Sequence, residues 1–465
     1  MKSLVVLLAI LMGPVSAGCG AKEQKPASQI PSVRWDLFLD TLQERTLNYF
    51  LVSTDPASGL APDRWPSRSP SSIAAVGFGL TCYPIAAERG LIPRPKAARS
   101  TLTTLRFLLS APQHDRADGA IGYRGLFYHF VAIPEGTRAW NCELSTVDTA
   151  LLMAGVLMCQ SYFGGADSTE TMVRHIADSL YRRVDWTWTA EGRPGIVLGW
   201  TPEKGFDRES WRGYNEAMIM YILALGSPTH PVSPAVWDYW TSTYVWAEYY
   251  GWDFVSFGPM FGHQFSHCWI DYRGIQDLYT REKGIDYFEN SRRATYSQRA
   301  YGADNPGRFR GYSENVWGVT PCDGPGDTSF VVDGTRRRFI GYAGRGVSFD
   351  WALDDGTLAP TGAGASVAFA PEICIPALKA MRDQHGARLW TAYGFVDAFN
   401  PTFVTPATGP AGWYDHDYLG IDQGPIAIMI ENLRNGFVWE VMKKNSYVAQ
   451  GLKRAGFTGG WLDKR

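Results

Sequence analysis

The sequence predicts an all-α fold, an (α/α)6 toroid barrel in which an outer ring of helices surrounds an inner ring. About twelve segments carry the apolar periodicity of a helix. Some, such as 33–52 and 168–186, are amphipathic, whereas 147–158, 217–225 and 426–430 are apolar on nearly every side. A helix that is apolar all round must be buried all round, and none of these runs reaches the ~20 residues of a membrane span. The alternation of half-exposed with fully buried helices therefore predicts two concentric rings.

The expected elements follow one another along a single domain, 33–465. The predicted helices cover 33–52, 72–89, 94–110, 145–163, 168–186, 214–225, 233–246, 284–302, 371–384 and 424–443, with shorter ones near 264–272 and 446–455. A minor β or loop insertion is expected near 320–370. There, Phe330-Val331-Val332 and Arg338-Phe339-Ile340 have an extended pattern between glycine-rich turns.

The composition excludes several classes of protein. The 465 residues include 44 Lys and Arg against 46 Asp and Glu, and this balance argues against a nucleic-acid partner. Charged residues make up 19% and aromatic residues 14%, which excludes a disordered chain or a coiled coil. A chain rich in aromatic residues and poor in charge is typical of proteins that bind sugars, although aromatic residues also fill ordinary cores. Phosphate-loop, dinucleotide-binding and serine-elbow motifs are absent from the sequence.

The N-terminus predicts export from the cytoplasm. Lys2, the apolar run 4–12 and the small residues after it form a secretory signal peptide. The sequence Ser16-Ala17-Gly18-Cys19 is similar to a bacterial lipobox, with serine where leucine is usual, so we expect Cys19 to be lipidated. Cleavage after Ala17 by ordinary signal peptidase is the alternative. We expect a signal peptide at 1–18, a tether at 19–32, and a monomeric periplasmic or outer-membrane lipoprotein of a bacterium.

The other cysteines are expected to be small buried hydrophobic residues rather than disulfide partners. Their spacings are wide and they contain no CxxC pair, which also argues against a zinc site. They are Cys82, Cys142, Cys159, Cys268, Cys322 and Cys374.

The first candidate for chemistry precedes a fully apolar helix. Ser145 and Asp148 have the spacing of a capping box, so Asp148 is either a capping residue or a sugar ligand. Glu143 lies before the cap and is not needed for it. In a toroid, the loops before inner helices open onto the central cavity, which would place Glu143, flanked by Trp140 and Asn141, beside a sugar. The alternative is a glutamate favoured by the helix dipole.

Glu216 occupies the equivalent position before the next apolar helix, between Trp211, Tyr214 and that helix. Two carboxylates on one cavity wall are what glycoside hydrolysis requires, one as the acid and one as the base or nucleophile. Burial beside aromatic rings raises a carboxyl pKa, whereas a helix N-terminus lowers it. The sequence slightly favours Glu216 as the acid and leaves the opposite assignment of the pair open. A first-turn glutamate without catalytic function is the alternative.

A third stretch spaces His263, His267 and Asp271 four residues apart, which on one helix would form a polar stripe. The stripe lacks the glutamate of a HExxH motif and a fourth ligand, so we expect no metal and no cofactor. The side chains either bind sugar hydroxyl groups or form a buried polar network.

Further sugar-binding candidates combine a carboxylate with aromatic, amide or glycine neighbours. They are Glu314 with Trp317, Asp397 and Asp422. The alternative for Asp422 is a capping residue of the helix that follows it.

A set of motifs from about residue 35 to 457 resembles one known family. The motifs are Ser58-Gly59-Leu60, Asp63-Arg64-Trp65-Pro66, Gly125-Leu126-Phe127-Tyr128-His129-Phe130, Glu143-Leu144-Ser145-Thr146, Leu223-Ala224-Leu225-Gly226-Ser227-Pro228-Thr229-His230, the run from His263 to Asp271, Asp422-Gln423-Gly424-Pro425 and Ile430-Glu431-Asn432. The chain resembles the bacterial glucoamylase-like proteins, which include endo-β-1,2-glucanases of glycoside hydrolase family 144. This resemblance implies an (α/α)6 barrel, inverting hydrolysis of β-1,2-glucan and an exported location.

Two departures from the family pattern bear on specificity, because Cys142 and Cys268 stand where serine or alanine is expected. A non-catalytic glycan-binding lipoprotein on the same barrel is the alternative function. The presence of both Glu143 and Glu216 favours the hydrolase, because a binding protein has no need of the pair.

Overall fold

Residues 35–465 are described by a computed structural model of the chain. The predicted signal peptide, the lipidation site at Cys19 and the tether lie outside the described residues. Within residues 35–465, no helix combines the length and the apolar character that crossing a membrane would need.

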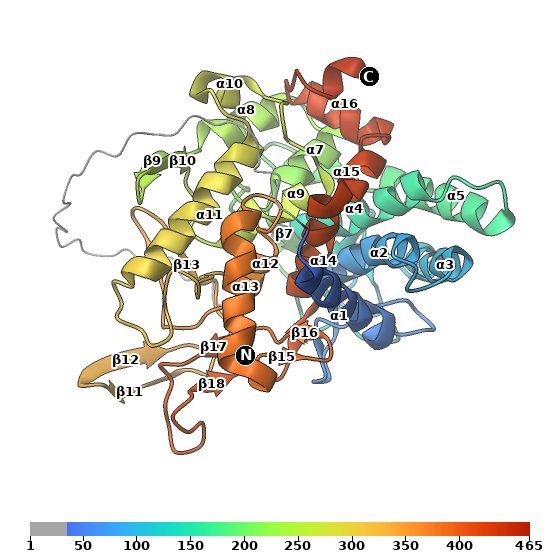
Figure 1. Cartoon of the computed structure of the whole chain (residues 1–465). Helices are drawn as coiled ribbons and strands as arrows, with labels where there is room; N and C mark the ends of the chain where they lie inside the picture. Colours follow the sequence, from blue (N-terminus) through green and yellow to red (C-terminus); the bar gives the residue numbers. More distant parts are fainter. Residues whose placement is uncertain (1–34) are drawn as a thin grey trace.

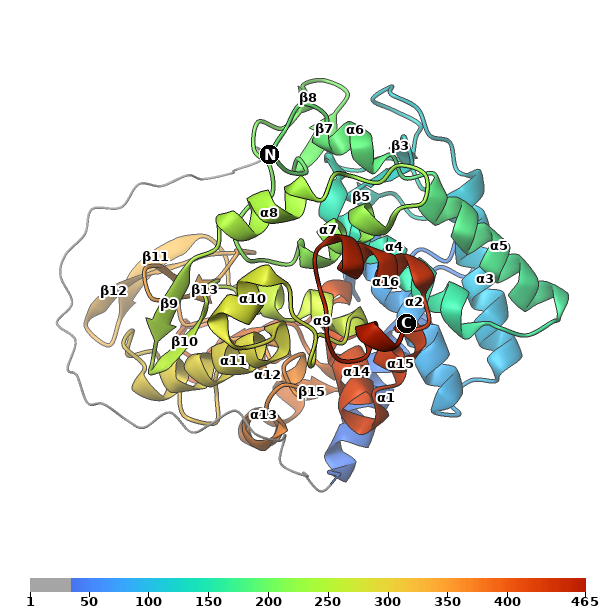
Figure 2. The same ribbon diagram turned by 90° about the horizontal axis from the view of Figure 1, so that it is seen from above.

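The fold is mostly helical, and six buried helices form its centre (Figures 1 and 2). They are α2 (Ile73–Glu88), α4 (Thr146–Tyr162), α7 (Met218–Gly226), α9 (Phe265–Trp269), α12 (Thr361–Gly364) and α14 (Gly420–Asn435). Contacts link α2 to α4, α4 to α7, α7 to α9, α12 to α14, and α14 back to α2. Gln264, at the start of α9, completes the cycle by donating to the carbonyl of Gly362 in α12 at 3.0 Å.

Partly exposed helices pack outside these six. They are α1 (Leu37–Ser53), α3 (Arg94–Ser110), α5 (Ser168–Arg182), α8 (Ala235–Ser242), α11 (Tyr287–Asp304), α13 (Pro371–His385) and α16 (Ser446–Arg454). Among them, α1 packs on α14, α5 on α4, α13 on α12 and α16 on α7. Short helices α6 (Trp186–Ala190), α10 (Leu278–Lys283) and α15 (Phe437–Met442) complete this layer.

Helices α2 and α4 approach each other more closely than side chains would permit. A Cβ atom added at Gly77 would collide with the backbone of Leu151, and one added at Gly155 would collide with the backbone of Gly77. Glycine at both positions therefore allows the two backbones to touch. Elsewhere apolar side chains fill the centre, and each buried leucine or isoleucine contributes about 1.5–3 kcal/mol to stability.

Short strands precede three of the buried helices. β2 (Ser71–Ser72), β6 (Leu144–Ser145) and β19 (Tyr418–Leu419) lead directly into α2, α4 and α14. β2 pairs with β5 (Phe130–Val131), and β19 pairs with β1 (Arg64–Trp65). These hydrogen-bonded pairs join the segments that enter the buried helices.

The remaining strands form one larger sheet and several hairpins. The five-stranded sheet has the order β3-β4-β6-β7-β8, with β3 (Gly122–Tyr123), β4 (Leu126–Tyr128), β7 (Gly199–Thr201) and β8 (Gly205–Phe206). The hairpins are β9 (Trp246–Tyr249) with β10 (Trp252–Val255), β11 (Thr328–Val332) with β12 (Thr335–Phe339), β13 (Gly346–Val347) with β14 (Ala352–Leu353), β15 (Trp390–Thr391) with β16 (Gly394–Phe395), and β17 (Phe399–Asn400) with β18 (Trp413–Tyr414).

The predicted helices are confirmed, but several differ in extent. The segment 214–225 becomes helical only from Met218, and 168–186 ends at Arg182. The segment 233–246 is helical only to Ser242 and continues into β9, and 424–443 is interrupted at Gly436, whose positive φ of 69° ends α14. The predicted helix near 264–272 is reduced to α9, preceded by a separate turn of 3-10 helix, η1 (Met260–His263). The insertion near 320–370 is confirmed by the β11–β12 hairpin, which projects on the side opposite α3 and α5 (Figures 1 and 2). The expectation of an all-α fold outside that insertion is wrong, because the five-stranded sheet and the β9–β10 and β17–β18 hairpins lie elsewhere in the chain.

The six cysteines among the described residues are all free, and five of them are buried. The expectation of small buried hydrophobic residues is confirmed for these five. Cys142 is half-buried, and its thiol exchanges hydrogen bonds with the backbone of Phe130.

Candidate active site

Acidic side chains gather where the chain enters the buried helices. Glu143 and Asp148 flank the start of α4, Glu216 lies just before α7, and Asp422 is in the first turn of α14. Asp63 precedes β1, which pairs with the strand leading into α14. We call the eight residues of this region the acidic band: Asp63, Glu143, Asp148, Glu216, Asp323, Asp397, Asp415 and Asp422.

His129 joins two of these carboxylates. Its Nδ1 lies 2.9 Å from Glu143 Oε1, and its Nε2 lies 3.7 Å from Asp148 Oδ2. Burial disfavours the charged ring, but Asp148 and Glu143 outweigh it and raise the pKa of His129 to about 9. Burial in turn raises the pKa of Glu143, but the hydrogen bond and the charge of His129 bring it below its usual value. At neutral pH the pair is therefore a histidinium with an ionised Glu143.

The loop before Glu143 is fixed by backbone contacts. Arg138 donates from Nε to the carbonyl of Cys142 at 2.6 Å and from Nη2 to the carbonyl of Asn141 at 2.9 Å. Trp140 and Asn141 adopt positive φ angles of 54° and 52°, which turn the chain sharply before α4. This conformation leaves Trp140 64% exposed.

The exposed ring of Trp140 continues a line of aromatic rings that begins at the acidic band. Phe130 stacks on His129 with the ring centroids 4.0 Å apart, and Trp140 lies 5.0 Å from Phe130. An exposed aromatic face beside hydrogen-bonding carboxylates is an arrangement that can hold a sugar ring.

Glu216 has the opposite protonation preference from Glu143. The residue is half-buried, but its Oε2 atom is enclosed and has no hydrogen-bond partner. Burial, aided by the negative charge of Asp148, raises the pKa of Glu216 to about 8. Ser266 Oγ, in α9, donates to the backbone carbonyl of Glu216 at 3.3 Å and fixes its position. Glu216 is therefore protonated at neutral pH while Glu143 is ionised.

A second part of the acidic band surrounds Arg64. Its Nη1 atom lies 2.8 Å from Asp323 Oδ2, and its Nε lies 3.3 Å from Asp63 Oδ2. Asp397 Oδ2 accepts a hydrogen bond from the backbone amide of Asp323 at 2.8 Å. Asp397 and Asp422 are within hydrogen-bonding reach of each other, and burial raises the pKa of both.

The two parts of the band are continuous. His129 and Asp63 are close enough for the charge of each to shift the pKa of the other. The negative charge of Asp148 likewise raises the pKa of Glu216. The carboxylates therefore form one region that begins beside α7 and ends beside α14.

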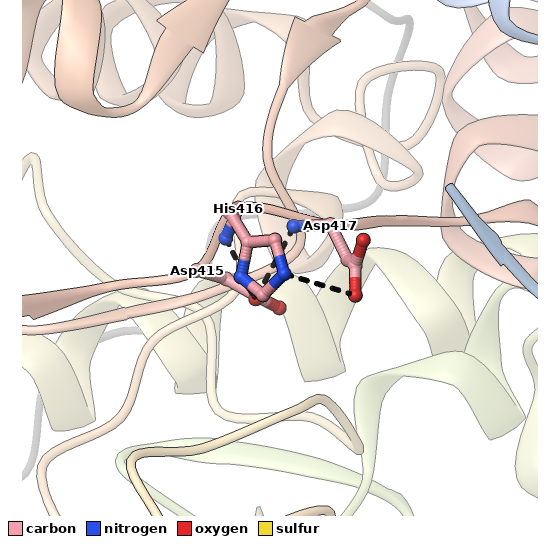
Figure 3. A group of neighbouring side chains, drawn as sticks. All are labelled: Asp415, His416 and Asp417. Atoms are coloured by element: carbon pink, nitrogen blue, oxygen red, sulfur yellow. Dashed lines mark hydrogen bonds and ion pairs between the residues drawn. The ribbon is translucent and has the colours of Figure 1, made fainter. Parts of the chain in front are cut away.

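At the far end of the band, the exposed His416 lies between the buried Asp415 and Asp417 (Figure 3). The exposed His416 ring lies between the two carboxylates, 3.6 Å from Asp415 Oδ1 and 3.7 Å from Asp417 Oδ2. Asp417 Oδ1 accepts a hydrogen bond from the backbone amide of Ser67 at 2.8 Å, which ties this segment to the loop after β1.

Three of the predicted sugar ligands have only internal partners among the described residues. His263 and His267 are fully buried, and burial lowers their pKa to about 4 and about 3, so both rings are neutral. His263 Nε2 lies 3.2 Å from the carbonyl of Phe257, and Tyr214 is buried against the His263 ring. This arrangement is the buried polar network that the sequence left as an alternative.

The predicted helical stripe of His263, His267 and Asp271 is wrong. His263 belongs to η1, His267 belongs to α9, and Asp271 follows the end of α9. Asp271 is 3% exposed and forms ion pairs with Arg273 at 2.7 Å and Lys443 at 2.8 Å. Because α9 has only five residues, no single helix carries the three side chains.

Three further predicted residues are held by neighbours outside the acidic band. Trp317 is fully buried, and Glu314 is exposed and forms an ion pair with Arg299. Trp211 is half-buried and donates from its indole N–H to Thr146 Oγ1 at 3.0 Å, at the start of α4. Trp211 therefore supports the helix that carries Asp148.

Sequence reasoning did not single out several members of the site. Asp422 was named as a sugar ligand or helix cap, but its match with Asp148, at the same third position of a buried helix, was not recognised. His129, Asp323 and Asp415 lie on loops or strand ends, where no helical spacing marks them. Their partners are distant in sequence, as in the contact between Arg64 and Asp323.

The geometry can support acid–base chemistry on a bound sugar. It combines carboxyl groups of raised pKa, among them Glu216, with an ionised Glu143, a histidinium and an exposed aromatic ring. Three carboxylates could also hold a cation, because Asp323, Asp397 and Asp415 each place an oxygen within 4.8 Å of the others.

Comparisons with known proteins connect this arrangement to carbohydrate hydrolysis. A family model described as "Glycoamylase: Putative glucoamylase" matches residues 208–446. The exo β-1,2-glucooligosaccharide sophorohydrolase (non-reducing end) of Parabacteroides distasonis is 28% identical over 453 residues, which cover 90% of this chain and 57% of that protein. The chain thus spans a little over half the length of that curated relative.

Two solved structures are similar over nearly their whole length. A putative glucoamylase from Bacteroides uniformis is 31% identical, with a TM-score of 0.78 over 91% of this chain and 98% of that chain. An endo-β-1,2-glucanase from Chitinophaga pinensis, in complex with sophorotriose and glucose, is 26% identical, with the same TM-score and the same coverages.

Proposed function

The chain belongs to the "putative glucoamylase" family, and from this premise we propose that it is a glycoside hydrolase that cleaves β-1,2-linked glucan. The similar proteins of Parabacteroides distasonis and Chitinophaga pinensis act on β-1,2-glucans or their oligosaccharides, which supports this substrate. The family name suggests starch as a substrate, but neither of these relatives supports it. We infer that the cycle of six buried helices is the inner ring of an (α/α)6 toroid.

The observation that carries the proposal is the contrast between Glu216 and Glu143. Glycoside hydrolysis needs one carboxylic acid that donates a proton to the leaving oxygen and one carboxylate that removes a proton from water. Burial keeps Glu216 protonated, with a pKa of about 8, whereas His129 keeps Glu143 ionised. We therefore assign Glu216 as the general acid and Glu143 as the general base of an inverting reaction.

The reaction follows from these two protonation states. Glu216 transfers its proton to the glycosidic oxygen as the bond to the anomeric carbon breaks. Glu143 takes a proton from the water that attacks the opposite face of the sugar, so the anomeric configuration inverts. We infer that the exposed face of Trp140 stacks against a neighbouring glucose unit.

We propose endo cleavage, as in the Chitinophaga pinensis relative. The test is to incubate the purified protein with linear glucans of β-1,2, β-1,3, β-1,4, β-1,6 and α-1,4 linkage and to follow product lengths over time. We expect a mixture of oligosaccharides from β-1,2-glucan at early times. Release of a single short product from the start would replace the endo assignment with an exo one, and inactivity on β-1,2-glucan would refute the substrate.

A glycan-binding protein without activity is the second candidate, and the site does not favour it. Hydroxyl groups of a sugar can be bound by ionised carboxylates, so a binding protein has no use for a glutamate that is held protonated. Binding of β-1,2-glucan without any cleavage would support that candidate instead.

A further inference from the structure

The carboxylates of Asp323, Asp397 and Asp415 converge from three separate segments. Asp323 lies in the loop before the β11–β12 hairpin, Asp397 lies between β16 and β17, and Asp415 directly follows β18. All three are buried, and each offers an oxygen within 4.8 Å of the others.

Two of these side chains have an enclosed oxygen that meets no N–H donor. Asp397 is 2% exposed; its Oδ2 accepts from the Asp323 amide at 2.8 Å, while its Oδ1 meets no N–H donor and the Asp422 carboxyl group lies within hydrogen-bonding reach. Asp415 is 7% exposed; its Oδ1 accepts from the amides of His416 and Asp417, while its Oδ2 has no partner. Burying a carboxylate oxygen without a hydrogen-bond partner costs free energy of folding. We therefore expect these atoms to bind a cation or to carry a proton.

Nearby positive charge is insufficient for this cluster. Arg64 is divided between Asp63 and Asp323. Among the described residues, Asp397 has no ion-pair partner, and Asp415 meets only the exposed His416 ring at 3.6 Å. Asp422 adds a further carboxylate beside Asp397. A divalent cation would supply the missing charge.

The backbone holds the cluster in place. The amide of Asp397 donates to the carbonyl of Asp417 at 2.9 Å, and the amide of Asp415 donates to the carbonyl of Ala398 at 2.9 Å. These bonds extend the pairing of β17 with β18, and Arg64 fixes the third carboxylate. A cation therefore needs little rearrangement of the chain to bind.

We propose that Asp323, Asp397 and Asp415 bind a calcium ion. Carboxylate oxygens without nitrogen or sulfur ligands select hard cations such as Ca²⁺ and Mg²⁺. Ca²⁺ takes about six to eight oxygen ligands in a flexible geometry, whereas Mg²⁺ demands a near-octahedral one and loses its water reluctantly. Carboxylates from three separate loops, with the Asp422 carboxyl group beside Asp397, therefore fit calcium better.

The test is calorimetric titration of the chelator-treated, desalted protein with CaCl₂ and, separately, with MgCl₂ at pH 7. We expect one Ca²⁺ per chain with a Kd of roughly 10⁻³ M or tighter, weaker binding of Mg²⁺, and a higher Tm in Ca²⁺. Asp415→Asn should weaken Ca²⁺ binding by about 10-fold or more. Asp333→Asn, on an exposed carboxylate in the turn between β11 and β12, is the matched control and should bind as the wild type does.

A second measurement uses the wild-type protein alone, because Asp415→Asn can fail to fold. Tb³⁺ at this site should luminesce on excitation of tryptophan, since Trp413 is two residues from Asp415, and Ca²⁺ should displace it. No heat and no Tm shift with Ca²⁺ at about 10 mM would overturn the proposal, since it is far above the expected Kd. The carboxylates would then share protons instead. Both readouts measure binding, so they are independent of whether the protein hydrolyses glucan.

Discussion

The protonation of Glu216 is decided by burial rather than by its position at a helix start. The start of α7 favours a negative charge, yet enclosure of Oε2 without a partner raises the pKa of Glu216 to about 8. The protonated form therefore persists at neutral pH, as a general acid requires. Glu143 has the same type of position before α4, but His129 reverses the outcome there.

Replacing Glu216 by glutamine should slow hydrolysis by about 10²–10⁴-fold and change the pH dependence of stability. The pKa of Glu216 rises on folding, so its favourable contribution is complete below about pH 4.5 and is lost as pH rises toward 8. Glutamine does not ionise, so Glu216→Gln does not lose this stability as pH rises. Thermal unfolding should show the variant gaining stability relative to the wild type from pH 5 to pH 8, by a few kcal/mol in all, since one pKa unit equals about 1.36 kcal/mol.

Glu314→Gln is the matched control for that variant, because Glu314 is an exposed side chain in a surface ion pair. Its unfolding curves should keep the pH dependence of the wild type, and its activity should be unchanged. If the stability of Glu216→Gln changes with pH as that of the wild type does, Glu216 is ionised in the folded state.

His129 should set the acidic limit of activity. The pKa of Glu143 is lowered by the hydrogen bond and the charge of His129, and burial raises it once that charge is gone. His129→Gln should therefore move the acidic limb of the kcat/KM profile to higher pH. His175→Gln, on an exposed histidine of α5, is the control and should leave the limb in place. An unmoved limb in His129→Gln would remove Glu143 from the role of base.

At the scale of elements, the units of a short strand and a buried helix place the acidic side chains. β6 leads into α4, and β19 leads into α14, and each helix carries an aspartate at its third position, Asp148 and Asp422. Strand pairing fixes where each helix begins, and the helix fixes the direction of its first-turn side chains. The site thus depends on the packing of the helices behind it.

The contact between α2 and α4 offers a direct test of that dependence. Gly155→Ala should destabilise the protein by about 3 kcal/mol or more, because the added methyl group meets the backbone of Gly77 and not a movable side chain. Chemical denaturation measures the change. Gly164→Ala, just after α4 and facing open space, should be nearly neutral. Equal stability of the two variants would contradict the close approach of the helices.

For the whole molecule, the sequence predicted the helices better than the connections between them. Helices such as α4 and α14 are apolar on every side, and this pattern marks complete burial. The four-residue α12 and the two-residue strands are too short to show a period, and tertiary contacts define them.

The residues of the candidate site also fall into two groups, those that a helix pattern predicts and those that only tertiary contacts bring together. Glu143, Asp148 and Glu216 were predicted because each lies at the start of an apolar helix. Asp323 and Asp415 were not, because they come together with Asp397 only when separate loops fold against one another. The spacing of residues along the chain does not reveal such contacts.

A separate prediction concerns the processing of the N-terminus, which lies outside the described residues. We expect the mature chain to begin at a lipidated Cys19. Mass spectrometry of the protein purified from a bacterial host should give an N-terminal peptide heavier than its sequence by a diacylglyceryl group and an acyl chain. An unmodified peptide beginning at Gly18 would instead show a protein released by ordinary signal peptidase.

The central claim, that Glu216 is the acid of an inverting β-1,2-glucanase, is tested most directly by following the anomeric protons of fresh product by NMR. Wild-type protein acting on β-1,2-glucan should first release reducing ends in the α configuration, which then equilibrate. Glu216→Gln should be slower by about 10²–10⁴-fold while remaining folded. A β-configured first product, or near wild-type cleavage by Glu216→Gln, would contradict the account.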